Sequence, residues 1–193
     1  DMVLIGLVGI RDDVRPEARD AIQEVQAAGI QVVMITGDRK ETAVAIAKEA
    51  GLFKGGSDIA ITSAELNAMS DEEVKQKIKD IRVISRALPT DKSRMVRLCQ
   101  ELNLVVGMTG DGVNDSPALK QADVGFAMGS GTDVAIETSD VVLMNSNFSN
   151  LPHALGLVKA TANNMKQNIV ISVGVVLVLL TSVFFSEWMN MSI

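Results

Sequence analysis

Apolar stretches and amphipathic stretches alternate along most of this chain. MVLIGLVGI at 2–10 is rich in β-branched residues, and a second apolar stretch, IQVVMI, follows at 30–35. Between them, RPEARDAIQEVQAAG has Pro16 in its first turn, early acidic residues and Gly29 as its stop, which predicts a helix. The apolar stretches lack a strict polar alternation, as expected of strands covered on both faces.

The same alternation continues to about residue 144. Ser70 and Glu73 have the spacing of a capping box, which predicts a helix start, and Thr90 is the expected cap of a helix over 90–102. Strands alternating with helices predict βαβ units, and hence an α/β fold with a mostly parallel sheet and helices on both faces. The remaining predicted elements are a helix at 40–50 and short strands at 58–62, 82–87, 104–108, 124–128 and 141–144.

The pattern changes after Lys166, because no residue from 167 to 186 is charged. An α-helix needs about 20 apolar residues to cross a bilayer, whereas strands seldom exceed about 10 residues. A buried core helix or a Val-rich strand is the alternative. We expect a stalk helix at 149–166, a transmembrane helix at 167–186 and an interfacial end at 187–193, where Trp188 suits the membrane surface.

Composition narrows the class of protein. Apolar residues make up 47% of the chain and aromatic residues only 3%, so the core must be aliphatic. The net charge of −6, without clustered basic residues, argues against a nucleic-acid partner. The one cysteine, Cys99, cannot form an internal disulfide, and it shares a helical face with Met95 and Leu98, which predicts a small core residue rather than a nucleophile.

Two acidic loops follow predicted strands: TGD at 36–38 and TGDGVND at 109–115. In open α/β sheets, ligands bind beyond the carboxyl ends of the strands. Each loop alone could be an ordinary turn, because Gly, Asp and Asn are common turn formers. However, Asp111 and Asp115 crowd two charges into one short loop, and Mg²⁺ would compensate them through oxygen ligands.

A lysine strengthens this interpretation. Lys92 lies in the first turn of a predicted helix, where the helix dipole disfavours a cation. A lone lysine there could simply be solvated, but beside two acidic loops we expect it to neutralise a phosphoryl group. Pro117 then opens a helix whose N-terminal amides also suit an anion. The stretch GSGTDVAIE at 129–137 could contact phosphate through its glycines, although a tight turn before a helix is the expectation.

Three stretches resemble the phosphorylation domain of P-type cation-transporting ATPases, in the haloacid-dehalogenase superfamily. They are MITGDRKETAVAIAKEAGL, ALPTDKSRMV and MTGDGVNDSPALKQADVGFAMGSGTDVAIETSDVVLM, and the likeness is loose only at 57–81. RDDVRPEA resembles the family's hinge strand, with Asp12 and Arg15 at matching positions, and NNMKQN resembles the start of the fifth membrane helix. The resemblance implies a Rossmann-like domain of the haloacid-dehalogenase type at 1–148.

The resemblance also implies roles for particular residues. Asp111 would be the side-chain Mg²⁺ ligand, with Asp115 also at the metal. Thr36 and Gly37 would contact the phosphoryl oxygens, and Lys92 would neutralise charge on the transferring group. By the same resemblance, Asn114 and Asp115 would complete the hydrogen bonding of their loop and support the metal site. Asp38 would stabilise its own loop or approach the nucleotide, and Arg15 would bind the nucleotide or phosphate.

The family's phosphorylated aspartate sits in DKTGT, which occurs nowhere in these 193 residues. In the family that segment lies upstream, so we expect a chain truncated on its N-terminal side that depends on missing upstream domains of the same polypeptide. We expect the fragment alone neither to hydrolyse ATP nor to form a phosphoenzyme. The resemblance implies a multi-pass membrane protein with this domain facing the cytoplasm, ATP as substrate and Mg²⁺ as cofactor.

The transported cation stays open between calcium and a transition or heavy metal. TSAELNAMSDEEVKQKI and PALK lean toward the calcium-type branch, whereas NNMKQNI leans toward the heavy-metal branch. The span at 167–186 contains no carboxylate, Cys or His that could hold a cation. Two alternative hypotheses are a soluble haloacid-dehalogenase phosphatase and a non-catalytic regulatory domain of the same fold. The uncharged span argues against the soluble phosphatase.

Overall fold

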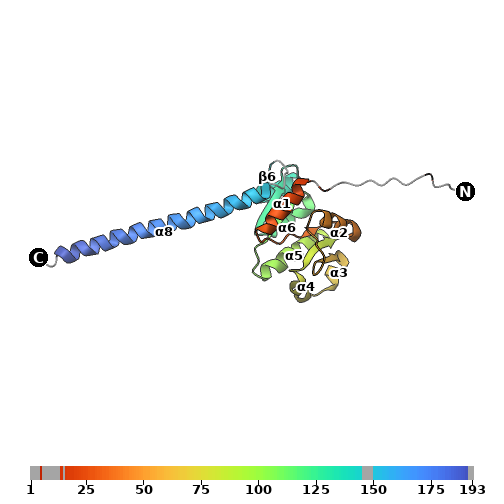
Figure 1. Ribbon diagram of the computed structural model, residues 1–193, viewed down its shortest axis with the longest axis horizontal. Coiled ribbons are helices and arrows are strands. Elements are labelled where there is room, and N and C mark those ends of the chain that lie inside the picture. The colour runs from red at the N-terminus through yellow and green to blue at the C-terminus, as the bar shows by residue number, and fades with distance from the viewer. Residues whose placement is uncertain (1–4, 6–13, 15, 145–149, 191–193) are drawn as a thin grey trace. The chain divides into compact units, whose positions relative to one another are not determined.

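The computed structural model of the chain describes residues 5, 14, 16–144 and 150–190 (Figure 1). The strand expected at 2–10 lies outside the described residues, apart from Ile5. The chain divides into two compact units, Asp1–Leu151 and Pro152–Ile193. The candidate chemistry falls in the first unit, and the long uncharged run falls in the second.

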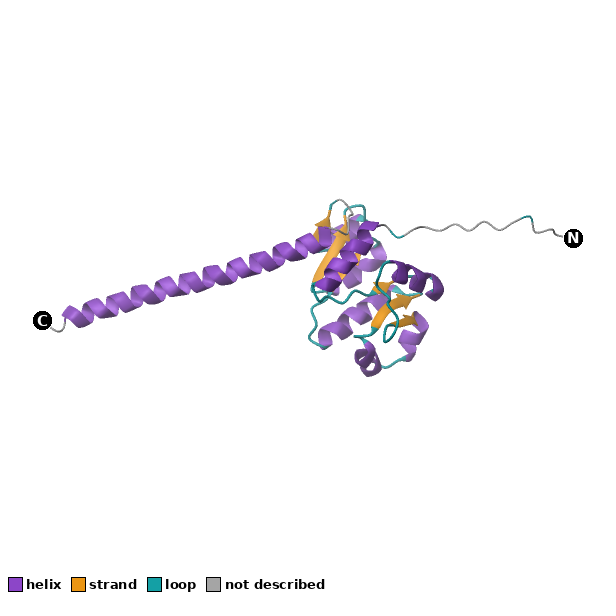
Figure 2. Cartoon of the chain, in the orientation of Figure 1, coloured by secondary structure: helices purple, strands orange, loops and turns teal. Residues whose placement is uncertain are grey.

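Strands and helices alternate through the first unit (Figure 2). Pro16 in the first turn and Gly29, at φ +81° just past the end, delimit the first helix as the sequence predicted. The described elements are α1 (Pro16–Ala27), β1 (Met34–Ile35), α2 (Lys40–Glu49), β2 (Ile59–Thr62), α3 (Ser63–Ala68), α4 (Asp71–Lys77), β3 (Ile81–Ser85), α5 (Pro89–Glu101), β4 (Gly107–Gly110), the 3₁₀ turn η1 (Val113–Asp115), α6 (Ser116–Gln121), β5 (Val124–Met128), α7 (Asp133–Thr138) and β6 (Val141–Leu143).

The strands form two three-stranded sheets in which every pair is parallel. In the first sheet the order is β1-β3-β2, with Met34 opposite Val83. In the second the order is β4-β5-β6, with Gly107 opposite Val124. Consecutive parallel strands need a crossover, and helices supply it. The predicted α/β fold with parallel strands is confirmed.

Helices cover both faces of the first sheet. Adjacent residues of β3 point to opposite sides: Val83 packs against Ala43 and Ala47 of α2, and Ile84 packs in a second cluster with Leu98 of α5. This burial on both faces explains why the strands are apolar without alternation. A third cluster, in the second sheet, contains Leu119, Ala127 and Ala135.

Several predicted strand boundaries were wrong by a few residues. Only Met34–Ile35 of the apolar stretch at 30–35 pairs with β3. The strand expected at 104–108 lies instead at Gly107–Gly110, while Val105 is 85% exposed. Pairing with a neighbouring strand, rather than local hydrophobicity, sets where a strand begins, and here β5 pairs with the start of the TGDGVND stretch.

The cap predicted for α5 was also wrong. Leu88 is the N-cap and Pro89 occupies the first turn, so Thr90 lies inside the helix. The side chain of Asp91, not that of Thr90, accepts a hydrogen bond from the Leu88 N–H, at 2.8 Å. A proline suits a first helical position because its missing N–H would have no intrahelical partner there.

The described residues of the second unit all belong to one helix, α8 (Asn150–Asn190), which begins two residues before that unit. In the part of the chain that the structure describes, one stretch is long and apolar enough to cross a membrane by length and composition: Asn163–Ser182, with a mean hydropathy of 1.6 and none of it buried. This stretch overlaps the transmembrane helix expected at 167–186. The side chain of Trp188 lies outside the described residues.

Candidate functional site

The candidate site lies where parallel strands end. TGD directly follows β1, Lys92 lies in the first turn of the helix after β3, and the second acidic loop begins within β4. Because β1 and β3 are neighbours in one parallel sheet, the first two motifs share an edge of that sheet. This is the edge at which ligands bind in open α/β sheets.

Hydrogen bonds close the TGD loop on itself and fasten it to the end of β3. Thr36 Oγ1 donates to Asp38 Oδ2 at 2.9 Å and accepts from the Asp38 N–H at 3.2 Å. The Thr36 N–H donates to Ile84 O at 2.9 Å, and the Ala87 N–H donates to Thr36 O at 3.0 Å. Asp38 therefore stabilises its own loop, and open space surrounds Gly37, since an added Cβ would meet nothing within 4 Å.

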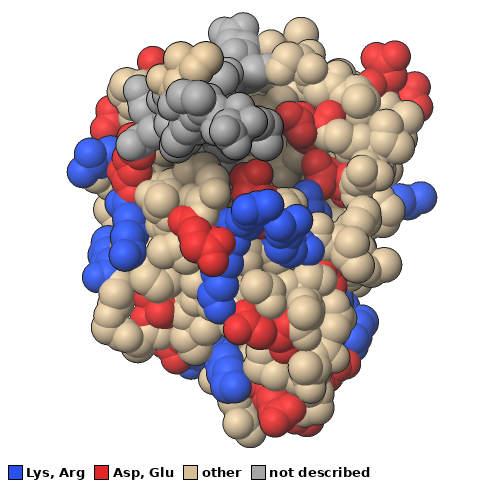
Figure 3. Space-filling model, turned by 90° about the vertical axis from the view of Figure 1, so that its right-hand side faces the viewer, with Lys and Arg blue, Asp and Glu red and all other residues tan. Residues whose placement is uncertain are grey.

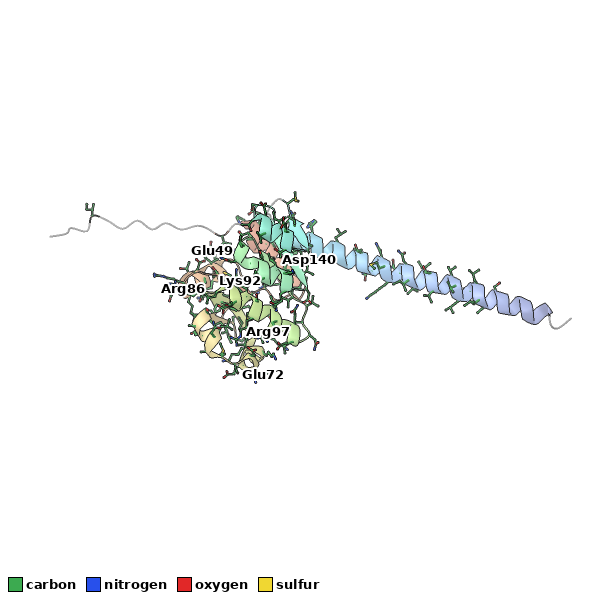
Figure 4. All side chains as sticks on the ribbon, turned by 180° about the vertical axis from the view of Figure 1, so that it is seen from behind. Glu49, Glu72, Arg86, Lys92, Arg97 and Asp140 are labelled. Carbon is green, nitrogen blue, oxygen red and sulfur yellow. The ribbon has the colours of Figure 1, made fainter. Side chains whose placement is uncertain are left out.

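Arg86 belongs to the same edge, although the sequence did not single it out. Its N–H donates to Asp38 O at 2.9 Å, and its φ of 53° lies in the left-handed region that non-glycine residues seldom adopt. Such conformations persist where the surroundings hold them, often at functional sites. Figure 4 shows the Arg86 side chain directed outward at this edge. No sequence signal marks it, because an arginine gives no indication of a positive φ.

An ion pair joins the lysine motif to the second acidic loop. Lys92 Nζ on α5 pairs with Asp115 Oδ1 at the end of η1. The two side chains are 20% and 10% exposed, so solvent screens this pair less than a surface pair. The structure thus brings together two candidate residues, 23 positions apart, from two separate sequence motifs.

Two glycines shape the loop around Asp115. A Cβ added to Gly110 would lie 2.5 Å from Asp115 Cβ, so close approach requires glycine there. The Gly112 N–H donates to Asp115 Oδ2 at 3.3 Å, and the Asp115 N–H donates to Gly112 O at 3.0 Å. The hydrogen bonding expected of Asn114 is not seen among the described residues, because the 3₁₀ turn buries Asp115 and leaves the Asn114 side chain in solvent.

Asp111 is the open carboxylate of this loop. It is exposed, and its side chain makes no hydrogen bond or ion pair with any residue that the structure describes. Asp115, by contrast, already has Lys92 and Gly112 as partners. No group of three or more His, Cys, Asp or Glu that could hold a metal occurs within the described ranges. An exposed carboxylate without a protein partner fits Mg²⁺, which proteins hold through one or two carboxylates plus waters and phosphate oxygens.

Two buried polar residues beside the site were missed in the sequence. Asp91, 1% exposed, accepts hydrogen bonds from Ser63 Oγ at 2.5 Å, Asn67 Nδ2 at 3.0 Å and the Leu88 N–H. Ser116 Oγ is buried without a hydrogen-bond partner in the described part of the chain. The N3 position of Asp91 was a readable signal for a capping role, but its partners on α3 depend on tertiary packing.

The sequence also singled out two hinge residues and one cysteine. Asp12 and Arg15, assigned from the hinge resemblance, lie outside the described residues. Cys99 is half-buried against the core cluster around Leu98, and burial raises the pKa of its thiol above the ordinary value. A raised pKa lowers the thiolate population at neutral pH, which fits a packing residue rather than a nucleophile.

On the face shown in Figure 3, basic side chains gather near the middle and acidic ones lie around them.

A family model described as haloacid dehalogenase-like hydrolase matches residues 3–123, and a second model with the same description matches 92–155. The chain belongs to the haloacid dehalogenase-like hydrolase family. A calcium-transporting ATPase of Lactococcus lactis is 46% identical over 169 residues, which are 88% of this chain and 19% of that protein. An endoplasmic reticulum-type calcium-transporting ATPase of Arabidopsis thaliana is 47% identical over 170 residues, 86% of this chain and 16% of that protein.

A solved structure of a zinc-transporting PIB-type ATPase is also similar, with a TM-score of 0.66 and 35% identity, covering 85% of this chain and 22% of that chain. The predicted resemblance to P-type cation-transporting ATPases is therefore confirmed. This haloacid dehalogenase-like chain spans about a fifth of the length of the curated relatives named above.

Proposed function

We propose that this chain is part of the phosphorylation domain of an ATP-driven cation pump, joined to the stalk at 149–166 and the membrane helix at 167–186. The observation that carries the proposal is the ion pair between Lys92 and Asp115, at the strand ends where the TGD loop also lies. The relatives' names support the same class of protein. The domain would face the cytoplasm, where ATP is available.

Phosphoryl transfer depends mostly on positioning and electrostatic stabilisation, and the exposed charges here suit that task. Asp111 would hold Mg²⁺, and Asp115 would support the metal site while fixing Lys92. When bound, Mg²⁺ would supply positive charge that offsets the negative charge of the phosphoryl group. The Thr36 hydroxyl and the Gly37 backbone would contact those oxygens, because an open loop beyond a strand end lets the backbone approach closely.

The aspartate that is phosphorylated would come from an upstream segment of the same polypeptide. DKTGT is absent from the 193 residues, so the chain by itself would provide the metal, lysine and phosphate contacts without a nucleophile. We therefore expect no phosphoenzyme from the isolated chain. Incubating it with γ-labelled ATP and Mg²⁺, followed by an acid quench, tests this expectation. An acid-stable label on the chain would overturn it.

The positive control is the full-length protein, which should take up the label when Mg²⁺ and its transported cation are present. We infer that this cation is calcium, because the relatives quoted at 46% and 47% identity are calcium-transporting, whereas the zinc-transporting structure is 35% identical. Labelling of the full-length protein should rise with micromolar free Ca²⁺ and not with Zn²⁺. Labelling that depends on Zn²⁺ alone would contradict the choice of calcium.

A further inference from the structure

The loop before α7 lies directly against the backbone of Asp111. The Thr132 N–H donates to Asp111 O at 2.8 Å. A Cβ added to Gly131 would lie 3.0 Å from Asp111 O and 3.1 Å from Asp111 Cα. These two contacts come from a segment about twenty positions further along the chain. Tertiary packing, and not the local loop sequence, therefore restrains the backbone of Asp111.

We propose that Gly131 and Thr132 are positioning residues for the Asp111 carboxylate, and we name this pair the Asp111 brace. The inference rests on the proposed function, in which Asp111 holds Mg²⁺. The Asp111 side chain has no hydrogen-bond partner within the described residues, so the contacts of its backbone fix the Cα from which the carboxylate projects. Groups outside the metal's own ligands that orient a ligand contribute strongly to metal affinity.

The requirement for glycine at 131 is steric rather than conformational. Its φ lies outside the left-handed region, so another residue could adopt the backbone angles. The space for a side chain is missing, because the same added Cβ would also lie 2.9 Å from Met128 O. A methyl group there must therefore displace either the end of β5 or the Asp111 backbone.

Thr132 contributes through its backbone and has a separate side-chain role. Its hydroxyl accepts from the Ala135 N–H at 3.4 Å and so caps α7, as the predicted tight turn before a helix requires. Its φ of −71° is one that proline adopts. Thr132→Pro would remove both the donated N–H and the cap, whereas Thr132→Ala would remove only the cap. The difference between these variants isolates the hydrogen bond to Asp111.

Gly129 offers a matched control for Gly131. A Cβ on Gly129 would clash with the backbone of Met144, after β6, instead of Asp111. Gly129→Ala therefore disturbs the same turn with the same substitution but does not touch the brace. Both glycine variants should lower the thermal unfolding midpoint, so stability alone does not separate them.

The test is a titration of the full 193-residue chain, in detergent micelles, with Mn²⁺ as a spectroscopic substitute for Mg²⁺. Free Mn²⁺ is measured by electron paramagnetic resonance. Gly131→Ala and Thr132→Pro should each weaken binding by about tenfold, as loss of a group that orients a metal ligand typically does. Gly129→Ala and Thr132→Ala should stay within about twofold of the parent chain, well below that loss.

Asp111→Asn separates the two proposals. If Asp111→Asn leaves Mn²⁺ binding unchanged, or the parent chain binds no Mn²⁺, the proposed metal role of Asp111 fails and the brace fails with it. If Asp111→Asn abolishes binding while Gly131→Ala and Thr132→Pro bind like the parent, only the brace is wrong. Should Gly131→Ala fail to fold by circular dichroism, the comparison of Thr132→Pro with Thr132→Ala decides.

Discussion

At the level of single residues, the two carboxylates of one short loop, Asp111 and Asp115, differ in burial and in their partners. Asp115 is buried and paired with Lys92, whereas Asp111 is exposed and its side chain has no partner among the described residues. Crowded carboxylates repel one another unless cations compensate them. Lys92 compensates one of them within the protein, which leaves the other available to an external cation.

Lys92→Ala in the full-length protein should lower the rate of phosphoenzyme formation about 10²- to 10³-fold, the usual loss when one preorganised charge is removed. Rapid-quench labelling with ATP measures this rate. Lys120→Ala is the control, because Lys120 is exposed on α6. A rate within about twofold of the parent, against that expected loss, would contradict the role of Lys92.

Lys92→Ala also leaves Asp115 without its cation, which should cost about 1–3 kcal/mol of stability as an uncompensated buried acceptor. The double variant Lys92→Ala, Asp115→Asn should recover part of that free energy of unfolding, measured in urea, but none of the phosphorylation rate. Recovery of both quantities would mean that Lys92 acts only through stability.

At the scale of elements, a network of ion pairs fastens α4 to α5. Asp71 at the start of α4 accepts from Arg94 at 2.7 Å and from Arg97 at 2.8 Å, and Glu101 pairs with Arg97 and with Lys75. Hydrogen bonds from Arg97, and then from Arg94, lower the pKa of Asp71, and hydrogen bonds from Lys75 and Arg97 lower the pKa of Glu101. The network thereby fastens the C-terminal half of α5, the helix that carries Lys92 in its first turn.

The pH dependence of stability follows from these lowered pKa values. A carboxylate whose pKa is lower in the folded state stabilises the fold above its unfolded pKa, near 4, and loses that contribution as the pH falls through the folded value. The urea midpoint should therefore fall as the pH drops below about 4. Asp71→Asn should flatten this dependence, with Asp133→Asn as the control, because Asp133 is an exposed residue of α7. Parallel pH profiles for Asp71→Asn and the parent would exclude a contribution from the network.

At the scale of the whole molecule, the length of α8 is the main consideration. Its 41 residues extend about 60 Å at ~1.5 Å per residue, roughly twice the hydrocarbon thickness of a bilayer. If Asn163–Ser182 crosses the membrane, the preceding part of the helix remains outside it. A continuous helix can then transmit movement between the membrane and the end that follows β6.

A proline in this helix tests that transmission. Met165→Pro in the full-length protein should leave phosphoenzyme formation intact but reduce the cations transported per ATP hydrolysed, because proline breaks a helix at that point. Transport into vesicles and ATP hydrolysis are measured together. Met165→Ala, which keeps the helix, is the control, and an unchanged ratio in the proline variant would count against a rigid stalk.

The alternation of strands and helices and the parallel pairing of the strands could be predicted from the sequence alone, and the sequence also supplied the candidate site residues, whose roles stay predictions. These follow from local chemistry: Ser70 and Glu73 form the predicted capping box, and the two acidic loops follow the carboxyl ends of parallel strands, where ligands bind in open α/β sheets. The capping box of α3, formed by Thr62 and Glu65, was equally visible in the sequence and was missed.

The contacts between residues that are distant in the sequence became known only from the tertiary structure. Strand pairing placed β4 at Gly107–Gly110, so that it includes the first two residues of the TGDGVND loop, since ladder partners and not hydrophobicity fix a strand's limits. Packing of α5 against the loop after β4 made Asp115 the partner of Lys92 and left Asp111 open. Packing of the loop before α7 placed Gly131 against the backbone of Asp111. Contacts between distant segments depend on how whole elements pack, and no local pattern in a sequence records that.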